Sequence, residues 1–221
     1  MDLFEAIEAG NVSKVSFILA EDPSLAGSRS ATGVSALLWA RYRGQSEMVD
    51  ALLAADPSLD VFDAAALGRL PRLAELIDED PGQANAWSAD GFTPVGLAAF
   101  FGRPDAVKYL IGRGADVHAV ARNPMRVQPL HAAAAARSAE AVRLILEAGA
   151  DPDAQQQKGF TALMAARVHG DDEIIQLLLA HGAHDPAEPA EQADPAGPAG
   201  PADPADRADS QSESGNRSST S

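Results

Sequence analysis

The chain has 221 residues and a formal net charge of −15, from 17 Lys and Arg against 32 Asp and Glu. We expect no nucleic acid partner, because affinity for nucleic acid depends on Lys and Arg that neutralise phosphates. Cysteine is absent, which excludes disulfides, thiolate metal ligands and a cysteine nucleophile.

The sequence has no feature of a membrane or secreted protein. Its N-terminus carries no basic stretch followed by an apolar run, and no apolar segment approaches the roughly 18 residues that cross a bilayer. We therefore expect a cytoplasmic protein without membrane association.

One helical unit repeats along residues 1–183. The end of the first helix of each unit falls on an equivalent position, occupied by Gly10, Gly44, Gly68, Gly102, Arg137 and Gly170, at spacings of 34, 24, 34, 35 and 33 residues. The second helix of each unit carries apolar residues at helical spacing, such as Val107, Leu110 and Ile111. Because one unit cannot bury such a stripe alone, neighbouring units are expected to stack.

The second helices end at one of two signals, twelve residues after the equivalent position. Three units place a glycine there, at Gly114, Gly149 and Gly182, and the others place Asp-Pro, at residues 22–23, 56–57 and 80–81. Glycine adopts the left-handed conformation that closes a helix, and proline cannot continue one.

The opening of the first helix is the most specific motif. Residues 128–133 read Gln-Pro-Leu-His-Ala-Ala, and residues 93–98 and 161–166 restate the pattern. With a period near 33 residues, this resembles the Thr-Pro-Leu-His-x-Ala opening of ankyrin repeats. The resemblance implies an all-α solenoid of about six helix-turn-helix units with short β-turn fingers. It also implies a monomeric, non-catalytic module that binds another protein as an adaptor, inhibitor or regulator.

The predicted domain covers residues 1–183, in units of about 1–31, 32–58, 59–87, 88–119, 120–154 and 155–183. Residues 184–221 are rich in Pro, Ala, Asp and Ser, and they are predicted to be a disordered acidic tail. The use of Ala, Asp, Arg and Pro throughout the chain favours a bacterial source with a GC-rich genome.

Two departures from the period predict local features. The 24-residue spacing indicates that the finger between Asp56 and Asp63 is missing or reduced to a tight link, which would notch the binding edge. The finger at residues 120–127 is slightly long, and extra length at a fingertip is where a solenoid adds a contact.

No catalytic, phosphate-loop or metal motif is present, and we expect no cofactor. His169, His181 and His184 are interpreted as solvated surface. His131 is expected to hold a finger in place, because the resemblance assigns that role to the histidine of the opening. Trp39 is expected to pack in the core.

The resemblance places binding on the fingertips and on the exposed side of the first helices, centred on the fourth unit. Four aromatic residues cluster there, and arginines lie on either side. The predicted partner-binding residues are Tyr42, Arg43, Trp87, Asp90, Phe92, Phe100, Phe101, Arg122, Met125, Arg126, Val168 and His169. A partner with an acidic loop or helix and apolar anchors would match this composition.

Two alternatives remain open. Phe92 and one of the phenylalanines at 100 and 101 could pack beneath the finger or against Tyr42, which would remove them from the surface. In function, the chain could instead be a small-molecule binder or an enzyme with a site in the notch between units two and three. Its polar candidates there are Asp56, Asp60, Asp63 and Arg69, although helix capping explains the aspartates more simply.

Overall fold

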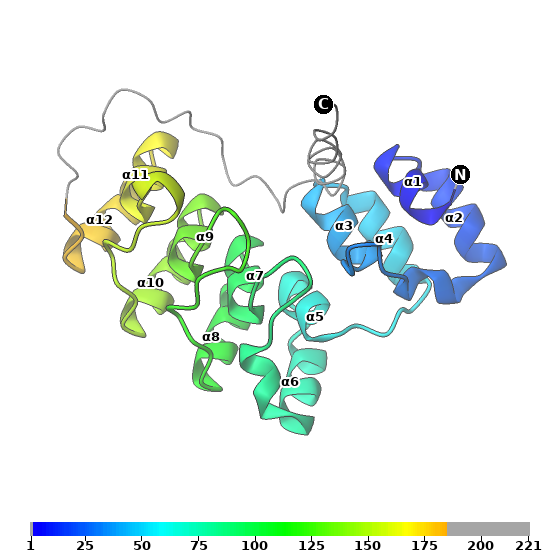
Figure 1. Cartoon of the computed structure of the whole chain (residues 1–221), viewed down its shortest axis with the longest axis horizontal. Coiled ribbons are helices and arrows are strands. Elements are labelled where there is room, and N and C mark those ends of the chain that lie inside the picture. Colours follow the sequence, from blue (N-terminus) through cyan, green and yellow to red (C-terminus); the bar gives the residue numbers. More distant parts are fainter. Residues whose placement is uncertain (1, 185–221) are drawn as a thin grey trace, which may run out of the picture.

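A computed structural model describes residues 2–184, and the predicted tail at 185–221 lies outside the described residues. The described part of the chain contains helices in six antiparallel pairs, arranged along an arc (Figure 1). The first helices of the pairs are α1 (Leu3–Glu8), α3 (Ala36–Tyr42), α5 (Val61–Leu67), α7 (Pro94–Phe100), α9 (Pro129–Ala135) and α11 (Ala162–His169). The second helices are α2 (Val12–Glu21), α4 (Ser46–Ala54), α6 (Leu70–Glu79), α8 (Pro104–Gly112), α10 (Ala139–Glu147) and α12 (Asp172–Ala180).

Short 3-10 turns follow two of the second helices that end at Asp-Pro, namely η1 (Pro23–Gly27) and η2 (Pro81–Asn85), and a third, η3 (Gln157–Gly159), precedes α11. In Figure 1 the first helices lie along the inner side of the arc and the second helices along its outer side. No strand forms between residues 2 and 184, where the extended segments make isolated β-bridges. The all-α solenoid predicted from the sequence is confirmed.

A left-handed residue ends each first helix. The six equivalent positions all have positive φ, between 56° and 69°, and five of them are glycine. Arg137 is the exception, with φ of 56°. It bonds the Asp171 carboxylate through Nε at 2.7 Å and through its terminal nitrogen at 3.1 Å.

Four fingers connect successive pairs in the described chain, at residues 28–35, 86–93, 119–128 and 153–161. In each finger a backbone hydrogen bond spans the tip, from Ser30 N to Val34 O, Ser88 N to Phe92 O, Ala121 N to Val127 O and Gln156 N to Phe160 O. The bond of finger 119–128 encloses two residues more than the other three, so the finger predicted to be long is long. His131 supports the next finger, because its buried ring lies with Nε2 2.8 Å from the carbonyl oxygen of Ala154.

No finger joins α4 to α5. Residues 56–60 run as an irregular link in which Asp56 takes a positive φ of 51°. The neighbouring fingers close the space, because a Cβ added to Gly33 would lie only 2.9 Å from the Cβ of Ala89. Finger 28–35 therefore meets finger 86–93 directly. The prediction that the missing finger notches the finger edge is wrong.

The gap opens on the outer side of the arc instead. Adjacent second helices pack along the solenoid, but α4 and α6 have at most sparse contact, whereas α3 and α5 still touch. The buried apolar residues accordingly form two clusters, one mainly of residues 3–52 and one of residues 61–183. The shortened link therefore leaves the two fingers in contact, while α4 and α6 splay apart.

Candidate functional site

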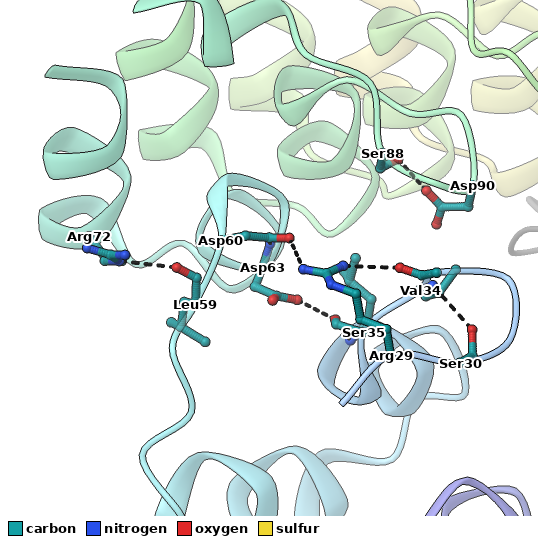
Figure 2. Close-up of polar contacts among 12 residues, drawn as sticks. Arg29, Ser30, Val34, Ser35, Leu59, Asp60, Asp63, Arg72, Ser88 and Asp90 are labelled. Carbon is teal, nitrogen blue, oxygen red and sulfur yellow. Dashed lines mark hydrogen bonds and ion pairs between the residues drawn. The ribbon is translucent and has the colours of Figure 1, made fainter. Parts of the chain in front are cut away.

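The junction between units two and three is held by polar contacts that cross from α3 and its finger to the start of α5 (Figure 2). Ser35 donates its hydroxyl to Oδ1 of Asp63 at 2.5 Å, and Arg29 pairs with Asp60 at 2.5 Å. Asp60 caps α5 by accepting the backbone N–H of Asp63 at 2.8 Å. On the outer side, Nε of Arg72 donates to the carbonyl oxygen of Leu59 at 3.1 Å. Asp60 and Asp63 are therefore engaged within the fold.

Asp63 is a buried carboxyl group, with 3% of its surface exposed. Burial raises its pKa to about 7, and the negative charge of Asp60 adds to this rise, while the Ser35 hydroxyl and Arg29 oppose it. A shifted carboxyl in a cleft is a candidate acid or base. Here, however, the carboxyl is enclosed by the junction, so its geometry serves the packing of the two units.

The aromatic residues at the ends of α3 and α7 pack on one another across the third unit. The ring of Tyr42 lies 5.8 Å from Phe100 and 5.3 Å from Phe101 between centroids, and Phe92 lies 6.1 Å from Phe100. We call these four residues the aromatic bridge. Ala66 holds the register position between Tyr42 and Phe100, and its methyl group leaves room for the rings of units two and four to meet.

This arrangement corrects part of the predicted binding surface. Phe92 is 4% exposed, so its ring belongs to the core. Tyr42 donates its hydroxyl to Oδ2 of Asp90 at 2.6 Å, and Ser88 donates to the other oxygen of the same carboxylate. Burial, followed by the charge of Asp90, holds the pKa of Tyr42 well above its usual value. The rings of Phe100 and Phe101 are half-buried, so the packing alternative describes the bridge better than a free aromatic patch does.

Other predicted residues lie on the exposed side of two neighbouring fingers. The guanidinium of Arg122 lies 4.1 Å from the centroid of the Trp87 ring, which places a cation on an aromatic face between fingers 86–93 and 119–128. Arg122 N also donates to Gly91 O at 2.7 Å. Met125 is half-buried at the tip of the long finger, beside Arg126, which is exposed. We call Trp87, Arg122, Met125 and Arg126 the finger surface.

Three predicted residues lie apart from the finger surface. Arg43 faces the first unit, where its guanidinium lies 4.9 Å from the Trp39 centroid and 4.0 Å from Glu8. Val168 and His169 are exposed at the end of α11, in the last unit. Trp39 itself is buried, as expected.

The histidines at the C-terminal end do not gather around a common point. His181 Nδ1 lies 2.8 Å from the carbonyl oxygen of Leu177, and His184 bonds Asp153 through both its backbone N–H and its ring. His184 thus belongs to the ordered domain, one residue beyond its predicted end. Among residues 2–184, no three His, Cys, Asp or Glu side chains are placed to hold a metal ion.

The outer side of the arc carries a cleft. It lies between α4 and the start of α6, and its lining includes Arg41, Arg69 and Arg103. Arg69 is among the residues predicted for the notch, whereas Arg103 is not. The sequence does contain a signal for Arg103, because the residue after the equivalent glycine is arginine in both the third and the fourth unit.

Comparison with known proteins agrees with this architecture. The family model described as Ankyrin repeats (3 copies) matches residues 61–156 and 118–188. Ankyrin repeat and SAM domain-containing protein 6 of Mus musculus is 31% identical over 151 residues, which are 65% of this chain and 13% of that protein. Ankyrin repeat domain-containing protein 49 of Homo sapiens is 42% identical over 65 residues, or 29% of this chain and 27% of that protein.

The chain is also similar to a bacterial ankyrin repeat protein. The putative ankyrin repeat-containing protein of Treponema pallidum is 38% identical over 93 residues, or 42% of this chain and 31% of that protein. The chain therefore spans less than a third of the length of each of these relatives. Within residues 2–184, no helix is long and apolar enough to cross a membrane.

Proposed function

Since this chain belongs to the ankyrin repeat family, we propose that it is a non-catalytic, cytoplasmic, monomeric module that binds another protein on its finger surface, as an adaptor, inhibitor or regulator. The observation that carries the proposal is the Arg122–Trp87 stack on adjacent fingers, beside Met125 and Arg126. Aromatic residues, Met and Arg are the types enriched in protein interfaces.

The charge of the chain supports this assignment. The chain carries a net charge of −15, yet two arginines gather on one fingertip beside apolar side chains. A partner with acidic side chains next to apolar anchors would pair with both features, and charge complementarity would select it over other proteins.

The area that the finger surface can bury determines which further residues a partner must contact. An aromatic ring buries about 150–250 Å², whereas a standard interface buries about 800 Å² per partner. With Phe92 in the core, Trp87 cannot supply this area alone, so the long finger has to contribute Met125 and both arginines. Additional contact along the inner side of the arc, as far as Val168 and His169 on α11, would complete such an interface.

Affinity purification from a native lysate, with mass spectrometry of the retained proteins, tests the proposal. The test variant carries Trp87→Ala and Arg122→Ala. The matched control carries Lys14→Ala and Phe17→Ala, which removes a cation–aromatic pair on α2, where Nζ of Lys14 lies 4.8 Å from the centroid of the exposed Phe17 ring. We expect a protein retained by the wild type and by the control to be lost by the test variant. Equal retention by all three folded proteins would refute the finger surface.

A further inference from the structure

Arginines from three successive units line the cleft between α4 and the start of α6. Arg41 comes from α3, Arg69 lies just before α6 and Arg103 just before α8. The cleft has a volume of about 200 Å³ and adjoins a larger hollow of about 560 Å³, with which it shares Leu53 and Arg69. It exists because the missing finger lets α4 and α6 splay apart.

These three arginines lack ionic partners inside the fold. Among residues 2–184, none of them lies within ion-pair distance of a carboxylate, although the chain has almost twice as many acidic as basic residues. Nε of Arg41 is buried without a hydrogen-bond partner. Burial, followed by the charge of Arg103, lowers the pKa of Arg41. Asp50 is the carboxylate in the lining, and it is exposed.

The fold holds two of the side chains in position without neutralising them. The guanidinium of Arg41 lies 5.1 Å from the centroid of the Phe101 ring in the aromatic bridge. Arg103 donates from Nε to the carbonyl oxygen of Ala66 at 3.3 Å, and its Cδ would lie 3.2 Å from a Cβ at Gly68. Since the side chains are partly fixed before a ligand arrives, binding would cost less conformational entropy.

We propose that this cleft binds a small phosphate-bearing molecule, whose phosphate oxygens accept hydrogen bonds from Arg41, Arg69 and Arg103. Arginine suits this role because its planar fork of donors matches phosphate oxygens. Three guanidinium groups, one from each of three units, match the three terminal oxygens of a phosphate group better than the two oxygens of a planar carboxylate. Val49, Leu53 and Leu67 supply apolar walls for the remainder of the molecule.

Isothermal titration calorimetry of the full chain at low ionic strength, with inorganic pyrophosphate as the probe, tests the proposal. We expect saturable binding with one site per chain, which Arg69→Gln and Arg103→Gln each weaken by about tenfold or more, because hydrogen bonds to charged groups carry that much affinity. The matched control is Arg113→Gln. It removes the same charge at the other end of α8, where Arg113 pairs with Asp78, and is expected to leave the affinity unchanged.

Acetate, as a carboxylate probe, separates the two ligand chemistries and should bind far more weakly than inorganic phosphate. The proposal is overturned if the folded wild type binds neither phosphate nor pyrophosphate, or if acetate binds as tightly as phosphate. An equal loss in the Arg113→Gln control also overturns it, because the attraction would then come from overall charge. The side chain of Arg69 is exposed and makes no hydrogen bond or ion pair within residues 2–184, so its variant keeps the test valid if substitutions at the other arginines prevent folding.

Discussion

Replacing Asp63 by Asn is expected to change the pH dependence of stability more than any other single substitution at the junction of units two and three. The carboxyl is buried between α3 and α5, and Asn keeps an oxygen that can accept the Ser35 hydroxyl. What the substitution removes is the ionised form of the group, whose burial raises its pKa from 3.8 to about 7.

The direction follows from proton linkage. The folded state holds the proton on Asp63 more tightly than the unfolded state does, so the carboxyl imposes no ionisation cost below about pH 4. Between about pH 4 and about pH 7 the carboxyl is ionised in the unfolded state but still protonated in the folded state. Folding then requires the uptake of a proton, so the free energy of unfolding falls as the pH rises. Above about pH 7 the carboxyl is ionised in both states, so its free-energy cost to folding no longer changes with pH. Each pKa unit corresponds to about 1.36 kcal/mol. A rise in the pKa of Asp63 from 3.8 to about 7 therefore lowers the free energy of unfolding by at most about 4 kcal/mol.

Urea unfolding of the wild type and of Asp63→Asn, in buffers from pH 4 to pH 8.5, measures this cost. The free energy of unfolding of the variant minus that of the wild type should increase with pH by up to about 4 kcal/mol and then level off near pH 7. Asp105→Asn, which removes an exposed carboxylate in the first turn of α8, controls for the loss of one negative charge. A difference that stays flat across this range, or that falls with pH, would show that Asp63 does not titrate as its burial implies.

Substitutions at three further positions test the packing of the repeats and their backbone conformation. Leu146→Ala, in the buried stripe of α10, should lower the free energy of unfolding by about 2–5 kcal/mol through a cavity, and an unchanged urea midpoint would contradict the packing. Ala66→Leu should cost about 1–3 kcal/mol by forcing the rings of the aromatic bridge apart, with a matching change in near-ultraviolet circular dichroism; a tolerated leucine would mean that the space above α5 is open. At position 137, where φ is positive, a Gly variant should melt about 2–4 °C above an Ala variant, since both lack the ion pair with Asp171 and only Ala keeps the left-handed strain.

The sequence by itself determined the repeat and most of its local geometry. Gly44 and Gly102 could be aligned because a left-handed residue must end each first helix, and this requirement is local. The buried apolar stripe of each second helix could also be predicted, because helical periodicity is visible in the local sequence. The length of finger 119–128 and the absence of a finger before α5 also followed from spacing.

Only the tertiary structure decided what these departures do. The 24-residue spacing before α5 showed that a finger was missing, but the position of the gap depends on which side of the solenoid closes. Fingers 28–35 and 86–93 came together, so α4 and α6 parted. The burial of Phe92 and the hydrogen bond from Tyr42 to Asp90 could not be predicted from the sequence either. Both depend on contacts between units that are not adjacent in sequence. Arg41, Arg69 and Arg103 meet at one cleft because side-chain contact between units depends on how the units stack, which no single repeat encodes.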